Sequence, residues 1–433
     1  MKIKGKYFSR GVKVHGNKTR TEERSIETLE PKSKVYISLS QHIGKLATSI
    51  VEAGQEVKCG QLIAKADGFV SANIYSSVSG KVLGIEKKML HSGIEGDFIV
   101  IENDFKYEEV FLEKMENPEP KAIVDRIREA GIVGMGGAGF PTDVKLSPKD
   151  PVDTLVINGA ECEPYLTCDY RLMVEKSEEV YKGIKYIAKA LGIKNIFIGI
   201  ELNKPKAIEI FDKFEDITVV MLKKQYPMGS EKHLIYCCTG RTVGVGKLPA
   251  SAGCVVQNIA TAFAVYDAIE NGRPLYKRVM TVSGLGVDEP KNLLVRNGMP
   301  FSEIREFCKE NDNAKMMISG GPMMGMALSD GEYYTTKTSS GLLLLTEEEI
   351  NVESPSPCIN CGRCADACPM HLLPMQIDFY TLSGAYEKAE KLGGVMDCIS
   401  CGSCAFSCPA KRALVQSITL AKQKIAILRG GRK

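Results

Sequence analysis

The chain carries one cysteine phrase twice. "PCINCGRCADACPM" runs from Pro357 to Met370, and "DCISCGSCAFSCPA" runs from Asp397 to Ala410. Both read C-x2-C-x2-C-x3-C-P, a spacing in which the first three thiolates bind one 4Fe-4S cluster and the fourth binds the other cluster of a pair. The repeat therefore predicts a small C-terminal domain folded around two clusters.

The predicted ligand sets are crossed between the two phrases. One cluster takes Cys358, Cys361, Cys364 and Cys408, and the other takes Cys398, Cys401, Cys404 and Cys368. Gly362 and Gly402 let each loop approach its cluster closely, and loop amides can donate hydrogen bonds to sulfur. The alternatives are zinc or purely structural thiols, but zinc sites rarely repeat this spacing and give no reason for a crossed fourth cysteine. Two neighbouring clusters predict one-electron transfer.

The fifteen cysteines of the 433-residue chain are not spread like a disulfide framework. The N-terminus, "MKIKGKYFSRGVKVHG", has no apolar stretch typical of a secretory signal, and no run approaches eighteen apolar residues. We therefore expect a reducing, cytoplasmic location, where clustered cysteines are more often metal ligands than disulfides. The net charge of +3 argues against nucleic acid as the main partner.

Residues 35 to 86 predict short strands joined by glycine turns. The stretch "SIVEAGQEVKCGQLIAKADGFVSANIYSSVSGKVLGIE" has the rhythm of a biotinyl or lipoyl barrel-sandwich, with Gly54, Gly60 and Gly80 where the hairpins favour positive φ. A carrier domain displays a lysine at the hairpin between its halves. This chain has "ADGFVSANI" there, so we expect the fold without the swinging-arm role.

A glycine loop follows the linker "ENPEPK". Apolar residues at 123, 124, 127 and 130 predict a helix, after which Gly134, Gly136, Gly137 and Gly139 come in close succession. The context is not that of a Rossmann fingerprint, because a helix rather than a strand precedes the glycines and Pro141 follows them closely. The backbone amides of such a loop can still bind a phosphate, so an anionic cofactor and a structural turn are the two alternatives.

Polar residues gather where the predicted strands end, which is where α/β sheets bind ligands. "DTLVING" leads into "AECEPYLTCDYRLM", and "NIFIGIE" ends at Glu201. The candidates are Asn158, Glu161, Glu163, Glu201, Glu231, Gln257, Asn258 and Thr261. Charged surface turns are the alternative. Cys237 and Cys238 lie in an apolar helical stretch and are expected in the core.

Three motifs, "GMGGAGFPTDVKL", "NGAECEP" and "YPMGSEKHLIY", resemble the flavin- and NADH-binding subunit of respiratory complex I. With the N-terminal sandwich and the paired clusters added, the chain is most similar to the RnfC family. These proteins are peripheral subunits of the membrane-bound Rnf complex, which couples ferredoxin and NAD to an ion gradient. The motifs "LSQHIG", "GGAGFPT", "NGAECEPY" and "CPAKR" carry the resemblance from about residue 34 to residue 425.

The resemblance implies a multidomain α/β chain. We expect a barrel-sandwich hybrid over residues 1–115 and an α/β domain that binds flavin and NADH over residues 116–275. A small β-grasp domain of the soluble-ligand-binding type is expected over residues 276–350. An α-helical, ferredoxin-like domain with two 4Fe-4S clusters is expected over residues 351–433.

The resemblance also implies sites for FMN and NAD(H). FMN would contact Gly134, Gly136, Gly137, Ala138 and Gly139, with Lys145 near its phosphate or ring and Asn158, Glu161, Asn258 and Thr261 completing the pocket. NADH would stack over the flavin near Phe140, Glu163, Glu201 and Glu231. No side chain is expected to act as acid or base, because FMN converts a hydride transfer into single-electron steps. Relatives have an arginine in place of Met135, so Lys145 is expected to balance the phosphate charge.

The N-terminal segment departs from the family pattern. RnfC proteins usually open with G-G-x-H-P-P and a lysine, whereas "GVKVHGNKTRT" keeps His15 and Lys18 and lacks both prolines. We expect this segment to face partner subunits. Two roles stay open: a subunit of an Rnf complex, or a donor like the proline-reductase-associated branch PrdC, which passes NADH electrons to a soluble reductase. An iron-sulfur conduit or scaffold subunit with an empty nucleotide pocket is a further alternative.

The expected partners are NADH and the proteins that exchange electrons with the clusters. The latter are other subunits of an electron-transfer complex, ferredoxin or a soluble reductase. Membrane contact is expected only through partner subunits, which would place the chain in the cytoplasm or at the inner face of the cell membrane.

Overall fold

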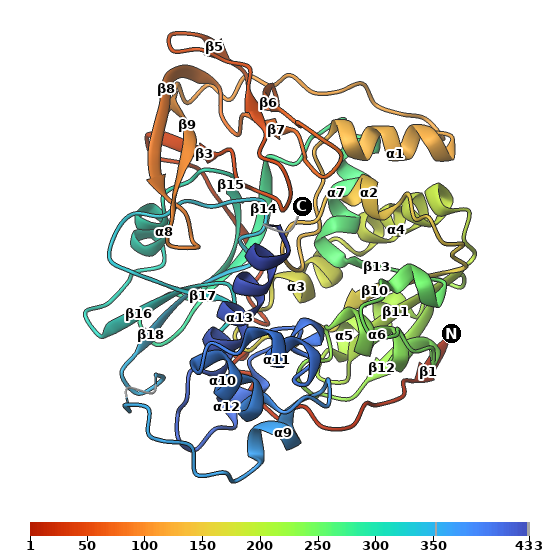
Figure 1. Cartoon of the computed structure of the whole chain (residues 1–433). Helices are drawn as coiled ribbons and strands as arrows, with labels where there is room; N and C mark the ends of the chain where they lie inside the picture. The colour runs from red at the N-terminus through yellow and green to blue at the C-terminus, as the bar shows by residue number, and fades with distance from the viewer. Residues whose placement is uncertain (351–352, 431–433) are drawn as a thin grey trace.

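The computed structural model describes residues 1–350 and 353–430, which form four packed units (Figure 1). An N-terminal sandwich, a parallel α/β sheet, a mixed sheet and a helical unit follow one another along the chain. Residues 351–352 and 431–433, at the two ends of the predicted cluster domain, lie outside the described residues.

The N-terminal sandwich consists of two small antiparallel sheets. The first pairs β3 (Lys34–Ser38), β9 (Glu95–Asn103), β8 (Gly80–Met89) and β5 (Glu56–Val57). The second pairs β4 (Thr48–Ser49), β6 (Leu62–Lys65) and β7 (Ile74–Tyr75). Inward-pointing side chains such as Ile37, Ile63 and Ile101 are fully buried in its core. A Cβ at Gly80 would lie 1.9 Å from the carbonyl oxygen of Glu102, so this bend requires glycine.

A parallel sheet of five strands forms the second unit. Its order is β1 (Lys2–Lys4), β12 (Thr218–Leu222), β11 (Asn195–Glu201), β10 (Thr154–Gly159) and β13 (Cys254–Asn258). The unit also contains α1 (Pro120–Glu129), α2 (Thr142–Lys145), α3 (Cys168–Glu175), α4 (Ser177–Leu191), α5 (Pro205–Phe211), α6 (Glu231–Thr239) and α7 (Ile259–Glu270). The central strands are almost continuously apolar because helices cover both faces.

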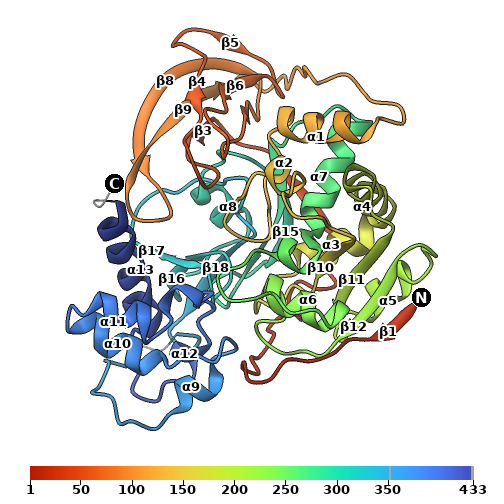
Figure 2. The ribbon, with the colours of Figure 1, turned by 45° about the vertical axis from the view of Figure 1, so that its right-hand side comes forward.

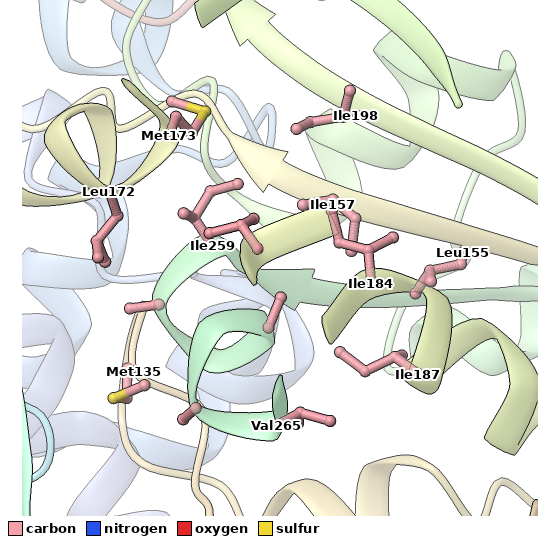
Figure 3. Close-up of a cluster of buried hydrophobic side chains, with 14 of the residues drawn as sticks. Met135, Leu155, Ile157, Leu172, Met173, Ile184, Ile187, Ile198, Ile259 and Val265 are labelled. Carbon is pink, nitrogen blue, oxygen red and sulfur yellow. The ribbon is translucent and has the colours of Figure 1, made fainter. Parts of the chain in front are cut away.

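Figure 3 shows the core on one face of this sheet. Leu155, Ile157 and Ile198 of the strands lie with Ile184 of α4 and Ile259 of α7 in one buried cluster. Met135 of the glycine loop belongs to the same cluster and is 4% exposed. On the other face α6 buries Cys237 and Cys238, which confirms their predicted place in the core.

The order in which the chain adds strands to the parallel sheet reverses at β10. From β10 the chain moves to β11 and β12 on one side, and it returns to the opposite side of β10 as β13. Such a switch point leaves a crevice beyond the carboxyl ends of the two strands, where ligands bind. The polar residues that follow β10 and β13 therefore meet at one crevice.

The third unit is a mixed sheet of six strands with one helix, α8 (Phe301–Phe307). Its order is β17 (Met326–Leu328), β16 (Ala314–Ser319), β18 (Gly341–Thr346), β14 (Lys277–Ser283), β15 (Lys291–Arg296) and β2 (Ile26–Leu29). The predicted sandwich range began at residue 1, but β1 pairs with β12 and β2 pairs with β15. The first thirty residues thus add an edge strand to each of two later sheets.

The fourth unit is helical. It contains α9 (Arg363–Ala367), α10 (Pro374–Leu382), α11 (Tyr386–Lys391), α12 (Ser403–Phe406) and α13 (Leu414–Gly430). Figures 1 and 2 both place this unit, in blue, beside β16 and β18 of the mixed sheet. Among the helices in the described part of the chain, none combines the length and apolar character needed to cross a bilayer.

Candidate functional site

The glycine loop between α1 and α2 is held over the start of α7. The Gly134 amide donates to the Phe140 carbonyl at 2.8 Å, which closes the loop on itself. The Met135 amide donates to the Thr261 hydroxyl at 3.1 Å, which ties the loop to α7. A Cβ at Gly136 would lie 2.9 Å from Asn258 Nδ2. Only glycine allows the loop to lie this close to the end of β13.

Two asparagines occupy the carboxyl ends of the strands at the switch point. Asn258 ends β13 and caps α7, because its Oδ1 accepts the amides of Ala260 and Thr261 at 2.9 and 3.4 Å. Its Nδ2 donates to Asp169 Oδ2 at 2.6 Å. Asn158 of β10 donates to the Gly229 carbonyl at 2.9 Å. Both side chains therefore hold neighbouring loops in place around the crevice.

These segments enclose a cavity of about 510 Å³, which we call the switch-point cavity. This volume falls in the range of small-molecule and cofactor sites. The predicted cofactor residues that line it are Gly134, Gly136, Gly137, Ala138, Gly139, Phe140, Lys145, Asn158, Glu161, Glu163, Glu231 and Asn258. Lys145 and Glu231 form an ion pair at its rim.

Glu161 has a backbone φ of 45° and a buried carboxyl group. Its Oε1 accepts the Asp169 amide at 2.7 Å, whereas its Oε2 has no hydrogen-bond partner and lies 3.9 Å from Lys18 Nζ. Burial raises the pKa of Glu161 to about 7, against the opposing effect of Lys18. The Nε2 of Gln257, another lining residue, also lacks a partner.

Buried polar atoms that lack a hydrogen-bond partner on two residues of one cavity wall are unusual. Glu161 Oε2 and Gln257 Nε2 can pair with a ligand that carries both donors and acceptors, as the ring edge of a flavin does. The glycine loop leaves its side of the cavity open, since a Cβ at Gly137 would have no atom within 4 Å. The residues present therefore fit a flavin.

Lys18 of the N-terminal segment lies behind this cavity. Its side chain is 8% exposed, and its ammonium donates to the carbonyls of Glu161, Glu163 and Leu166, the first two at 3.0 and 2.9 Å. Burial lowers the pKa of Lys18, and the charge of Glu161 opposes that shift. Lys18 points inward and holds the loop that carries Glu161 and Glu163, so it does not face a partner; for the segment as a whole the expectation stays a prediction.

Glu201 and Thr261 do not line the switch-point cavity. Thr261 is fully buried and acts through its bond to the Met135 amide. Glu201 is 2% exposed, and its Oε2 lies 3.7 Å from Lys204 Nζ. It lines a second cavity of about 290 Å³, together with Lys13, His15, Lys18 and Lys224. This second cavity lies at the ends of β11 and β12 and borders the switch-point cavity, because Cys162 and Tyr226 line both.

The eight predicted cluster ligands surround two small hollows. One is lined by Cys368, Cys398, Cys401 and Cys404, which we call the inner thiol set. The other is lined by Cys358, Cys361, Cys364 and Cys408, the outer thiol set. Each group contains the fourth cysteine of the other phrase, the same crossed grouping that the spacing predicts.

The local backbone of the two phrases is the same. Gly362 and Gly402 precede α9 and α12 with φ of 76° and 80°, and Asn360 and Ser400 both have φ of 54°. Within the described ranges, no three His, Cys, Asp or Glu side chains converge on a point that would hold a single metal ion. Thiols spread around a hollow suit a cubane, in which each corner takes one thiolate.

The two thiol sets differ in their surroundings. Cys358 and Cys361 of the outer set are exposed to solvent. Cys401 of the inner set is buried and, with Ile399, forms part of the wall of the switch-point cavity. The inner set therefore lies next to the predicted flavin, and the outer set reaches the surface.

Several lining residues were not predicted from the sequence. Asp169, Tyr226, Lys247, Met324 and Ile399 all line the switch-point cavity. Tyr226 begins "YPMGSEKHLIY" and Asp169 stands inside "AECEPYLTCDYRLM", so a scan for polar groups within those motifs would have found them. Met324 lies in the turn "GGPMMG" of the mixed sheet, and no sequence signal connects it to the site.

Three family models match the chain. They are the RnfC barrel sandwich hybrid domain over residues 6–106, the Nuo51 FMN-binding domain over residues 127–267 and a 4Fe-4S dicluster domain over residues 357–412. These matches confirm the multidomain α/β class, with its sandwich, its FMN-binding domain and its two-cluster domain. The β-grasp interpretation of residues 276–350 and the exact domain limits stay predictions.

Curated relatives match over nearly the whole chain. The C component of the proton-translocating ferredoxin:NAD(+) oxidoreductase complex of Clostridium ljungdahlii is 48% identical, covering 97% of this chain and 94% of the relative. The C component of the Na(+)-translocating ferredoxin:NAD(+) oxidoreductase complex of Acetobacterium woodii is 41% identical, covering 98% of each. The C component of the ion-translocating oxidoreductase complex of Rhodobacter capsulatus is 43% identical, covering 96% of this chain and 82% of the relative.

A solved structure shares part of the fold. The crystal structure of NAD+-reducing [NiFe]-hydrogenase in the air-oxidized state matches with a TM-score of 0.50 and 19% identity. The match covers 69% of this chain and 63% of that chain. At this identity the likeness concerns the fold alone.

Proposed function

Because the chain belongs to the RnfC family, we propose that it passes electrons between NAD(H) and partner redox proteins through FMN and two 4Fe-4S clusters. It would do so as the RnfC-type subunit of an ion-translocating ferredoxin:NAD oxidoreductase complex. The observation that carries this proposal is the wall that the switch-point cavity shares with the inner thiol set. The glycine loop forms one side of that cavity, and Cys401 of the inner set stands on another.

The chain's own residues would position the cofactor. In this proposal the glycine loop approaches the flavin through its backbone, and Asn158, Glu161 and Asn258 bind the ring or ribityl chain. Thr261 acts indirectly by fixing Met135. Lys145 is assigned to the phosphate, with its partner Glu231 beside it. No side chain is needed as a general acid or base.

FMN bound in the cavity would supply the conversion between the two-electron hydride of NADH and the single electrons that each 4Fe-4S cluster accepts. Phe140, Glu163 and Glu231 line the same cavity, and we assign them to the NAD(H) side. Glu201 lines the second cavity instead and takes no part in this assignment.

The different surroundings of the two thiol sets give the proposed route its order. The inner set lies at the cavity wall, so it holds the relay position next to FMN. The outer set has two exposed thiols, Cys358 and Cys361, so it exchanges electrons with the partner. The names of the relatives favour another subunit of a ferredoxin:NAD oxidoreductase complex as that partner. That complex would also be the chain's link to a membrane. No feature of the described residues favours the PrdC-like role.

An anaerobic NADH titration of the full chain, reconstituted with FMN and iron-sulfur clusters, tests the proposal. We expect NADH to bleach the flavin absorbance and to produce EPR signals of reduced clusters. Cluster signals that appear with dithionite but not with NADH would overturn the proposal and favour a conduit with an empty nucleotide pocket.

Matched cysteine variants test the order of the route. In Cys401→Ser, NADH should still bleach the flavin but should reduce neither cluster, whereas Cys358→Ser should leave the inner cluster reducible by NADH. Because the ligand sets are crossed, Cys408→Ser should behave like Cys358→Ser. If Cys408→Ser instead resembled Cys401→Ser in its EPR spectrum, the assignment of ligands would be wrong.

A further inference from the structure

Tyr226 connects the switch-point cavity to the loop of the inner thiol set. It follows β12, is 1% exposed, and is one of the largest fully buried side chains of the described residues. Its hydroxyl donates to the Cys401 carbonyl at 2.8 Å and lies 3.3 Å from Glu163 Oε1. Tyr226 is also one of the residues that line the switch-point cavity. One side chain therefore contacts both the cavity and the backbone of a cluster ligand.

Cys401 is the contact point between these two parts of the molecule. It lines the switch-point cavity, whereas the other three thiols of the inner set do not. A hydrogen bond to its carbonyl oxygen fixes the loop at the position where the inner set lies closest to the flavin domain. This bond joins residues 175 apart in sequence.

The turn of the mixed sheet around Met323 also contacts both Glu163 and the loop around Cys401. The Met323 amide donates to Glu163 Oε2 at 3.1 Å. A Cβ at Gly402 would lie 2.6 Å from the Met323 carbonyl oxygen, and a Cβ at Gly321 would lie 2.2 Å from Glu163 Oε2. The loop around Cys401 and the turn of the mixed sheet therefore meet backbone to backbone, and the carboxylate of Glu163 contacts the backbone of the same turn.

We propose that Tyr226 is the positioning residue for electron transfer between the flavin and the inner cluster. Its hydroxyl holds the Cys401 loop against the cavity wall, and its contact with Glu163 ties that loop to the segment assigned to NAD(H). This inference rests on the proposed function. The step it governs is the passage of one electron at a time from reduced flavin to the oxidised inner cluster, with the flavin's proton released to solvent.

Two measurable consequences follow from the hydrogen bond. Electron tunnelling falls steeply with distance, so a loosened Cys401 loop slows cluster reduction without slowing hydride transfer to the flavin. The hydroxyl also directs the positive end of its dipole toward the backbone of a cluster ligand, and positive dipoles near a cluster favour its more negative, reduced form. Its loss should therefore shift the potential of the inner cluster to a more negative value and leave that of the outer cluster unchanged.

The test compares Tyr226→Phe with Tyr75→Phe in the reconstituted full chain. Tyr75 is a matched control, because it is also a buried tyrosine whose hydroxyl donates to a backbone carbonyl, that of Glu129, in a region remote from both thiol sets. After rapid mixing with NADH, the rate of inner-cluster reduction is compared with the rate of flavin bleaching in the same sample. We expect the ratio of these two rates to fall at least fivefold in Tyr226→Phe and to keep its wild-type value in Tyr75→Phe.

An EPR-monitored redox titration with dithionite provides a readout that does not depend on NADH. A negative shift confined to the inner cluster of Tyr226→Phe supports the proposal. Wild-type potentials and rates in Tyr226→Phe, or equal effects in Tyr75→Phe, would overturn it. If NADH fails to bleach the wild-type flavin, the proposed function fails, and the dithionite titration still decides the role of Tyr226.

Discussion

At the scale of single residues, the most unusual feature is a group of buried charges behind the switch-point cavity. Lys18 and Glu161 face each other at 3.9 Å, and Glu201 and Lys204 form a second buried pair. Burial raises the pKa of Asp169 and of Glu201, and it lowers that of Lys18. Removal of one member leaves an uncompensated buried charge, which destabilises a protein strongly.

Lys18→Met should weaken both the fold and flavin binding. The substitution leaves three carbonyls of the Glu161–Leu166 loop without their donor, at a cost of about 3 kcal/mol in unfolding free energy. The loosened loop should lower FMN affinity about tenfold or more. Fluorescence titration with FMN and urea unfolding of the apoprotein measure the two effects. Lys13→Met, an exposed lysine of the same segment, is the control, and equal effects in both variants would contradict this account.

Glu161→Gln should change how stability depends on pH. The folded pKa of about 7 lies above the ordinary value of 4.5, so between these values the folded chain binds more protons than the unfolded chain. The stability of the wild type therefore falls as pH rises through that window and stays level above it. Relative to the variant, we expect a loss on the order of 2 kcal/mol between pH 5 and pH 8. If the wild type and Glu161→Gln gave parallel pH profiles of urea unfolding, Glu161 would be ionised over this whole pH range and the prediction would be wrong.

At the scale of elements, the glycine loop lacks side chains for two different reasons. At Gly136 a Cβ would press on Asn258, the residue that caps α7 and binds Asp169. At Gly137 a Cβ would meet no atom of the protein. Packing therefore explains the first glycine, and the close approach of a ligand would explain the second.

Alanine substitutions at Gly136 and Gly137 should affect different properties, the stability of the apoprotein at the first position and the affinity for FMN at the second. Gly136→Ala should lower the unfolding free energy of the apoprotein by about 1–2 kcal/mol, because Asn258 must move from its cap position. Gly137→Ala should leave the unfolding free energy unchanged but weaken FMN binding about tenfold, because the methyl group enters space that we assign to FMN. Thermal unfolding and FMN titration measure both. Wild-type FMN affinity in Gly137→Ala would place the flavin elsewhere.

The structure also shows which features the sequence could predict. The crossed cysteine groups follow from spacing within tight loops, and helix α1 and the end of β10 follow from local apolar patterns. Glu201 ends a strand just as the residues after β10 do. However, the switch point lies between β10 and β13, whereas β11 pairs with the other edge of β10. No local sequence pattern encodes this strand order. Tyr226 was missed for a similar reason, since its role depends on a contact with residue 401.

At the scale of the whole molecule, Lys337 joins three parts of the chain. Its ammonium donates to the carbonyl of Asn73 in the sandwich at 2.5 Å and to that of Gly131 after α1 at 2.7 Å. Its amide donates to Gln41 at 3.0 Å. The side chain is fully buried, and this burial lowers the pKa of Lys337 to about 7. Burial at this junction therefore disfavours the charged form of Lys337.

Stability should therefore rise with pH above neutrality. Between pH 7 and the ordinary value of 10.5, the unfolded chain binds more protons at Lys337 than the folded chain does. The slope is at most about 1.4 kcal/mol per pH unit, and Lys337→Met should lack this contribution. Urea unfolding at pH 7.5, 8.5 and 9.5 measures it, with the exposed Lys315→Met as control. An unchanged slope in Lys337→Met would show that Lys337 stays charged when folded.

The two edge strands contributed by the first thirty residues determine when two of the sheets can be completed during translation. β1 pairs with residues 219–221 and β2 with residues 292–295, so both strands leave the ribosome long before their partners exist. Domains otherwise tend to fold as they emerge. Lys18 lies between these strands and holds the loop that carries Glu161. We therefore expect the loop that carries Glu161 to reach its final form only after most of the chain has been translated, so that cofactor loading is a late event in the protein's maturation.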